Sequence, residues 1–268
     1  MLFDTGTAAP PVEINPAAGS NREGLGLGGN SLAYVGKGTL AAPTPGDIFH
    51  FDLSTSIVTR ITNDGLEDND LHVAPNGNVI VWSRCLIGDC DVLQAVRDGM
   101  GWTTSTVAGT SDVEERADTN GSIVVYTAAR AGETDLFWKS VAGGAEQQLV
   151  LSGLQKNPSI SGNIVSFESR AVGAGNADIF LYDIGTGGLY QITNTPNVSE
   201  SLNDLYVFPD GRINLVWEAD DDFDGNIYGA TFFLPAANAP APPTAMLLAL
   251  GLLGLLFGNR LPRRARRG

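Results

Sequence analysis

The chain has 268 residues and a formal net charge of −14, and all five arginines after residue 239 lie in the last nine residues, so the preceding body is still more acidic. Such a body repels nucleic acid and anionic lipid, so we expect no nucleic-acid partner, whereas divalent cations and cationic partners remain compatible. The hydrophobic fraction of 43% is sufficient for a packed core, and 33 Gly with 14 Pro fit many short strands joined by tight turns.

A block of about 44 residues recurs along most of the chain, and each copy begins with an aspartate followed by an apolar strand. The copies start at Asp47, Asp91, Asp135 and Asp178, which are 44, 44 and 43 residues apart. Even spacing in this range is typical of small antiparallel sheets arranged radially. The sequence therefore predicts an all-β fold of the β-propeller class.

Each block contains the pattern of four strands. The second strands are expected at 79–83, 123–127, 164–168 and 213–218, two of them directly after the Asn-Gly and Asp-Gly pairs that favour hairpin turns. The count favours five four-stranded blades within residues 1–234. Residues 226–232 form a third strand with no fourth strand after it. We expect a strand near residues 11–15 to complete that blade, which would close the ring and cover an open sheet edge.

Two segments resemble functional motifs only in their letters. Residues 24–29 match the glycine pattern of dinucleotide-binding loops, but a strand follows, where that motif needs a helix to hold the pyrophosphate. Residues 64–70 contain four acidic side chains without regular alternation or a glycine turn. We expect this acidic run to be a solvated loop.

Basic side chains within the repeats have expected positions as well. His50 alternates with an apolar residue along its strand and is expected to pack, whereas His72 is expected to face the central channel. Arg84, Arg130 and Arg170 lie near the ends of second strands. We expect each guanidinium to bridge carbonyl groups or acidic neighbours between blades.

The two cysteines, Cys85 and Cys90, lie in one expected hairpin loop. We favour a small disulfide that closes this loop, because the rest of the chain has features of an exported protein. Two thiols alone are too few for a closed zinc site. The other interpretation is a pair of free thiols in a cytosolic protein.

Residues 220–225 contain the pattern Asp-x-Asp-x-Asp-Gly, in which alternate carboxylates converge on a cation and the glycine permits a sharp turn. If calcium binds, the expected ligands are the side chains of Asp220, Asp222 and Asp224 and the backbone carbonyl of Asn226. Its role would be to stiffen the last blade. No carboxylate occupies the later ligand positions, so a solvated acidic loop remains the alternative.

The repeats resemble a known family. Residues 157–167, 178–183 and 191–194 look like TolB-like propeller repeats, and the resemblance extends over roughly residues 12–233. It implies a β-propeller fold and, more loosely, protein binding, because propellers carry out many unrelated functions. No residue pattern marks a nucleophile, so no catalytic residue or cofactor is assigned.

The C-terminal region has a different character. Residues 235–244 form a Pro/Ala-rich linker, residues 245–258 are apolar, and clustered arginines follow. The apolar stretch would span about 21 Å as a helix, which is short against roughly 30 Å of hydrocarbon but can be extended by flanking arginines. Residues 245–268 are therefore expected to form a hydrophobic transmembrane or sorting helix. The terminal arginines favour a cytoplasmic C-terminus with the propeller outside.

This tail resembles the PEP-CTERM sorting signal of Gram-negative bacteria, with Pro240 and Pro242 in the motif position and Ala241 where the family has glutamate. The resemblance implies export and processing at the membrane by an exosortase-like sorting protease. Residues 1–5 show neither the basic nor the apolar region of a signal peptide, which an exported protein is expected to carry. We expect inner-membrane anchoring first, and then a cell-surface or extracellular location.

These observations favour an exported surface propeller with a noncatalytic binding or structural role at the cell envelope or in the extracellular matrix. The ligand would be a protein or a polysaccharide, bound by the loops and the channel mouth of a rigid ring. An extracellular hydrolase or lyase with its site in the channel is the alternative. A purely structural surface-layer component is the third.

Overall fold

A computed structural model describes residues 20–39, 42, 44–99, 101–220 and 225–235. Within these ranges the regular secondary structure consists of strands, so the all-β prediction is confirmed. No helix among them is long and apolar enough to cross a membrane. Several predictions lie outside the described residues: the strand near 11–15, Asp222, Asp224, Pro240, Pro242 and the hydrophobic segment 245–268.

Nineteen strands are described. The first eight are β1 (Ser20–Gly28), β2 (Ser31–Thr39), β3 (Asp47–Asp52), β4 (Ile57–Arg60), β5 (Glu67–Val73), β6 (Val79–Leu86), β7 (Asp89–Asp98) and β8 (Gly101–Ala108). The next eight are β9 (Val113–Thr119), β10 (Ile123–Arg130), β11 (Glu133–Ser140), β12 (Gln147–Gln148), β13 (Leu154–Ser161), β14 (Ile164–Arg170), β15 (Asp178–Asp183) and β16 (Gly188–Gln191). The last three are β17 (Ser199–Val207), β18 (Arg212–Asp220) and β19 (Gly225–Phe233).

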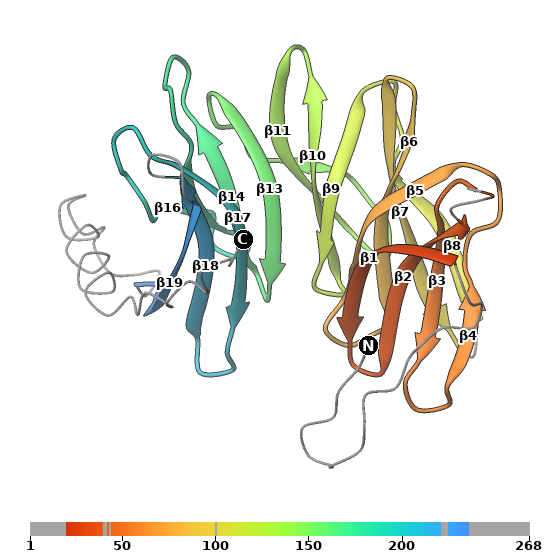
Figure 1. Ribbon diagram of the computed structural model, residues 1–268. Helices are drawn as coiled ribbons and strands as arrows, with labels where there is room; N and C mark the ends of the chain where they lie inside the picture. Colours follow the sequence, from red (N-terminus) through yellow and green to blue (C-terminus); the bar gives the residue numbers. More distant parts are fainter. Residues whose placement is uncertain (1–19, 40–41, 43, 100, 221–224, 236–268) are drawn as a thin grey trace, which may run out of the picture.

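Successive strands pair antiparallel in the groups β1–β4, β5–β8, β9–β12, β13–β16 and β17–β19. One parallel bridge, between Cys90 of β7 and Val113 of β9, joins the second and third groups into a continuous sheet. Figure 1 shows the groups following one another from β1–β4 on one side of the molecule to β17–β19 on the other. The first strand of each group contacts the first strand of the next, so β1, β5, β9, β13 and β17 form a series of inner strands.

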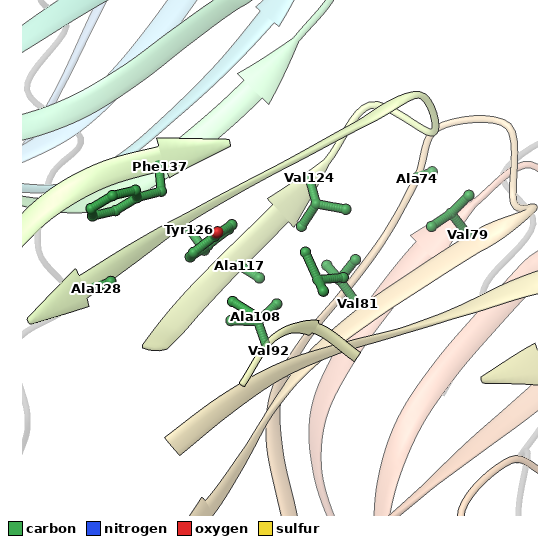
Figure 2. Close-up of a cluster of buried hydrophobic side chains, with 11 residues drawn as sticks. Ala74, Val79, Val81, Val92, Ala108, Ala117, Val124, Tyr126, Ala128 and Phe137 are labelled. Carbon is green, nitrogen blue, oxygen red and sulfur yellow. The ribbon is translucent and has the colours of Figure 1, made fainter. Parts of the chain in front are cut away.

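The hydrophobic core lies between neighbouring groups. One cluster joins Val79 and Val81 of β6 to Ala117 of β9 and to Val124 and Tyr126 of β10 (Figure 2). Full burial of a valine side chain stabilises the fold by roughly 1.5–3 kcal/mol. Because these residues come from different groups, the cluster holds two groups together and does not merely cover one sheet.

The repeated aspartate ties the third strand of a group to its fourth strand. Asp47, Asp135 and Asp178 each accept a hydrogen bond from the residue 13 positions later. The donors are Arg60 (2.5 Å), Gln148 (2.9 Å) and Gln191 (3.2 Å), respectively. Short fourth strands have few backbone pairs of their own. The side-chain bond therefore fixes their register, which accounts for the aspartate at the start of these three copies.

The glycine run at 24–29 lies mostly within β1, a strand that the sequence analysis did not predict. A Cβ atom at Gly28 would lie 1.9 Å from the carbonyl oxygen of Ala74, and one at Gly26 would lie 2.7 Å from the side chain of Val73. These glycines let β1 approach the backbone of β5 closely. Because these glycines lie in a strand and are followed by a second strand, they do not form a dinucleotide-binding loop, as the sequence predicted.

The prediction of a solvated loop at residues 64–70 is wrong for the part from Glu67 onward, which belongs to β5. Asp68 is completely buried. It accepts hydrogen bonds from Arg84 Nε at 2.7 Å and from Trp82 Nε1 at 3.0 Å. A buried carboxylate requires such partners. Asp68 and Arg84 lie 16 residues apart in sequence and face each other across the strand pair.

The prediction that the arginines pair with acidic neighbours is confirmed in two groups, but Asp68 and Glu114 lie on the adjacent strand of the same group and not on a neighbouring group. Arg84 pairs with Asp68 and also with Asp64 at 2.8 Å, and Arg130 pairs with Glu114 at 3.2 Å. Arg170 occupies the corresponding strand end but is exposed, and it forms no ion pair within the described part of the chain. The prediction is therefore wrong for Arg170.

Arg84→Ala is expected to destabilise the protein by about 3–5 kcal/mol, because it leaves the carboxylate of Asp68 buried without its cation. The measurement is urea denaturation at neutral pH. Arg170→Ala is the matched control and is expected to change stability by no more than about 0.5 kcal/mol. Equal losses in the two variants would contradict a special role for the Arg84 pair.

Candidate functional site

The inner strands of all five groups line one cavity of about 840 Å³. This volume lies in the range of ordinary ligand pockets, which is roughly 300–1,000 Å³. The charged and aromatic side chains that line it include Asp70, His72, Arg116, Asp118, Asp204 and Tyr206. The cavity is the place where the most chemistry-bearing side chains converge, and we treat it as the candidate functional site.

A bulge interrupts each inner strand. The ladder register shifts in all five strand pairs that contain β1, β5, β9, β13 and β17. At each shift one residue has a left-handed backbone: Gly24 (φ 53°), Asp70 (φ 47°), Arg116 (φ 57°), Asn157 (φ 48°) and Leu202 (φ 49°). A non-glycine residue in this conformation costs on the order of 1–3 kcal/mol. The conformational cost of a left-handed non-glycine residue recurs in four groups, so the bulge is a regular feature of the inner strands.

The bulge turns the two ends of an inner strand toward different environments, because one extra residue breaks the alternation of faces. The residue two positions before the left-handed one is buried: Asp68, Glu114, Gln155 and Glu200 are at most 2% exposed. The residue two positions after it lines the cavity: His72, Asp118, Ser159 and Asp204. A buried polar residue and a cavity-lining residue thus recur four positions apart.

His72 faces the cavity, as predicted, and contacts a neighbouring group. Its Nδ1 atom lies 3.4 Å from Oδ1 of Asp118, and the His72 side chain is 55% exposed. Partial burial disfavours the imidazolium, but the hydrogen bond and charge of Asp118, with the charges of Asp204 and Asp70, raise the pKa of His72 above its usual value. The imidazolium form therefore persists to higher pH than it does in a free imidazole, and the ring can act as a hydrogen-bond donor or as a proton carrier.

The carboxylates of the cavity are held by backbone and side-chain donors from adjacent groups. Asp118 accepts a hydrogen bond from the backbone N–H of Ile160 at 2.8 Å, and Asp204 accepts one from Ser159 Oγ at 2.9 Å. Arg116 donates to Asn157 Oδ1 at 2.8 Å. These bonds cross from one inner strand to the next, so they fix the wall of the cavity and orient its polar groups before any ligand arrives.

Other sequence-predicted residues lie away from this cavity. Cys85 and Cys90 form a disulfide across the β6–β7 hairpin. His50 is buried, contacts Ser31 Oγ at 3.0 Å and packs against Trp102, which confirms its expected packing role.

The proposed calcium ligands are described only in part. Asp220 ends β18 and Asn226 lies near the start of β19, whereas Asp222 and Asp224 lie outside the described residues. Among the described residues, one group of three carboxylates comes close enough together to hold a metal: Asp47, Asp64 and Asp68. Arg60 and Arg84 already pair with these three side chains, so their charge is compensated within the protein.

Sequence reasoning missed Asp118, Ser159 and Asp204. The signal that could have found them is a second repeat, in which an acid or amide precedes the cavity residue by four positions. It reads Asp68/His72, Glu114/Asp118, Gln155/Ser159 and Glu200/Asp204. The side chains differ between copies, so the repeat is visible only after the bulges have been located.

No protein-family model and no curated protein matches this sequence. Solved structures are similar in fold. They include TolB from Acinetobacter baumannii, at a TM-score of 0.54 and 20% identity, with 78% of this chain and 51% of that chain covered. A TolB protein from Agrobacterium tumefaciens has a TM-score of 0.53 and 15% identity, with 80% and 82% covered. An oligogalacturonate lyase in complex with manganese has a TM-score of 0.50 and 13% identity, with 75% and 59% covered.

These similarities are to the fold alone, because every identity is low. This chain spans about half the length of the Acinetobacter TolB chain. The fold is a TolB-like β-propeller, which confirms the part of the sequence analysis that rested on the repeats.

Asp118→Asn is expected to lower the pKa of His72, because it removes the charge that most favours the imidazolium. The measurement is an NMR titration of the two histidine rings. His50, which is buried away from Asp118, serves as the internal control and should titrate unchanged. A His72 pKa that stays the same in this variant would contradict the role of the His72–Asp118 contact.

Proposed function

We propose that this protein is an exported surface β-propeller that binds a protein or polysaccharide ligand, without catalysis, at its central cavity. The observation that carries the proposal is the cavity of about 840 Å³, which all five inner strands line and onto which four of them, β5, β9, β13 and β17, direct polar side chains. Hydrogen bonds between neighbouring strands hold these side chains in place, so a ligand would meet a preorganised surface and lose little affinity to ordering.

The proposed ring has five blades, one for each group of strands. The first four groups contain four strands, whereas β17–β19 contains three described strands. Ile227 and Phe233 of β19 are 76% and 61% exposed. An exposed apolar edge strand favours pairing with a further strand. We assign that role to residues 11–15, which would complete the fifth blade and connect the ends of the ring.

The proposed location is the cell envelope or the extracellular matrix, reached by export. Support comes from the order of linker, apolar segment and arginines at 235–268, with Pro240 and Pro242 in the motif position of a PEP-CTERM signal. In this proposal the C-terminus is cytoplasmic before an exosortase-like protease processes the tail. The Cys85–Cys90 disulfide is consistent with an oxidising compartment.

One observation favours a second function, an extracellular hydrolase or lyase. His72 and Asp118 form a contact pair in the cavity, and the raised pKa of His72 suits a general acid or base. The fold neighbours include an oligogalacturonate lyase. This second proposal requires a bound substrate to place the atom that gains or loses a proton within hydrogen-bonding distance of His72.

Binding is tested by screening the full chain against panels of polysaccharides and peptides. Asp204→Asn and Tyr206→Ala are expected to weaken binding of any hit by about tenfold or more, since both side chains line the cavity. Asp98→Asn, at the exposed end of β7 outside the cavity, is the control and should bind as the wild type does.

The same panel separates the two functions. Noncatalytic binding predicts no new ends or unsaturated products from bound polysaccharides, whereas the enzyme proposal predicts products that disappear in His72→Ala. Hits that bind the Asp204 and Tyr206 variants with unchanged affinity would rule out the cavity as the site.

We also propose that calcium binds the loop at 220–226 through Asp220, Asp222, Asp224 and the carbonyl of Asn226. Millimolar calcium is then expected to raise the Tm of the full chain. At a calcium concentration of 100 times the Kd, the gain in stability is about 2.7 kcal/mol. Asp222→Asn should abolish the shift and Asp98→Asn should retain it. An unchanged wild-type Tm would remove calcium from the proposal.

A further inference from the structure

A pair of carboxyl groups lies where the last two groups of strands meet. Glu200 is on β17 and is 2% exposed, and Asp178 begins β15 of the preceding group. The backbone N–H of Glu200 donates to the carbonyl oxygen of Ala177 at 2.9 Å, which brings β17 beside the start of β15. The two side chains are within hydrogen-bonding reach of each other.

One oxygen of each carboxyl group lacks a donor. Oε2 of Glu200 and Oδ1 of Asp178 are buried and have no hydrogen-bond partner in the described part of the chain. The other oxygen of Asp178, Oδ2, accepts from Gln191 at 3.2 Å. Two ionised carboxylates repel each other and offer acceptors only, whereas one shared proton supplies the missing donor and removes the repulsion.

The equivalent junctions between earlier groups handle the same positions differently. Asp47 lies beside Asp68, and Arg60 and Arg84 compensate both charges. The next junction places the charge of Asp91 near Glu114, and Glu114 pairs with Arg130.

At the third junction the second acid is replaced by the neutral amide of Gln155, which follows Asp135 by 20 residues. Only at the fourth junction do two acids meet without an arginine on either side chain among the described residues. Across the strand pair, Glu200 faces Ala219, whereas Asp68 faces Arg84.

We propose that Asp178 and Glu200 share one proton and form a pH-dependent latch between the last two groups of strands. With the proton in place, a hydrogen bond joins β15 to β17. When the proton leaves, two buried negative charges remain at the junction, and the junction is weakened. The inference does not depend on which ligand the cavity binds.

No cation on the neighbouring described strands pairs with the carboxyl group of Glu200, so none favours loss of the shared proton. The charged groups on the strands packed around β17 are Lys156 of β13, Glu168 and Arg170 of β14, Asp178 and Asp183 of β15, and Arg212, Glu218 and Asp220 of β18. Arg212 lies at the opposite end of β18 from Ala219, the residue that faces Glu200. Glu168 accepts a hydrogen bond from the backbone of Leu202, and Lys156 and Arg170 line a separate small pocket. The charge that acts on Glu200 is that of Asp178.

Burial and the charge of Asp178 raise the pKa of Glu200 from its ordinary 4.5 to about 7. The folded protein therefore binds this proton more tightly than the unfolded chain does. The resulting stabilisation is fully present below about pH 4.5 and is lost as the pH rises through about 7. The latch thus weakens between mildly acidic and neutral pH.

The latch acts on the wall of the cavity, because β17 carries both groups of residues. Glu200 lies two positions before the left-handed Leu202, and Asp204 and Tyr206 follow on the same strand and line the cavity. Loosening of β17 against β15 would therefore displace Asp204 and Tyr206 before the cavity residues of the other strands.

The test is Glu200→Gln in the full chain, studied by urea denaturation at pH 5 and pH 8 with EDTA present. The amide stays neutral at both values and can donate to Asp178. We expect the ratio of the unfolding constant at pH 8 to that at pH 5 to fall by about tenfold or more relative to wild type. The variant should also be more stable than wild type at pH 8.

Glu114→Gln is the matched control, because Glu114 is equally buried at the corresponding position but pairs with Arg130 and Thr110. It should lower stability at pH 8 and leave the pH ratio as in wild type. A wild-type ratio in Glu200→Gln would overturn the proposal.

Infrared difference spectra of the wild type between pH 5 and pH 8 provide a measurement that does not depend on the variant. They should show the carbonyl stretch of one buried protonated carboxyl group disappearing near neutral pH. Absence of that band at pH 6 would also overturn the proposal.

Discussion

The bulge in each inner strand is the constraint on which the rest of the structure depends. A regular strand would place residues four positions apart on the same face. One extra residue in the left-handed conformation places one of them in the junction between groups and the other in the central cavity. Packing between groups and the polarity of the cavity therefore depend on the same local feature, which recurs at Gly24, Asp70, Arg116, Asn157 and Leu202.

The junctions show how one backbone design accommodates different charges. Asp68 and Glu114 are balanced by Arg84 and Arg130, which reach them from the neighbouring strand of the same group. Gln155 is a neutral amide and carries no charge. Glu200 is an acid, and among the described residues no arginine pairs with it. Because a buried charge without a partner is costly, this last junction is where stability becomes sensitive to protonation.

The cavity residues, more than the fold, carry the functional argument, because the same propeller architecture serves proteins with unrelated activities. His72, Asp118 and Asp204 come from three different groups, and hydrogen bonds between inner strands set their relative positions. A rigid wall of this kind suits selective binding. The one feature that also suits chemistry is the histidine beside a carboxylate.

Sequence alone determined the all-β class, the repeat length, the second strands and the cavity position of His72. These features depend on hydrophobic alternation, turn residues and even spacing, all of which are local. Sequence reasoning failed at β1, where glycines hide a strand, and at residues 67–70, where a bulge breaks the alternation and the buried Asp68 stands among acids that resemble a solvated loop. The pairing of Asp68 with Arg84, the meeting of Asp178 with Glu200 and the convergence of Asp118, Ser159 and Asp204 were decided only by the tertiary structure. Each of these joins residues from different strands, and their relative placement follows from bulges and packing between groups that local pattern does not encode.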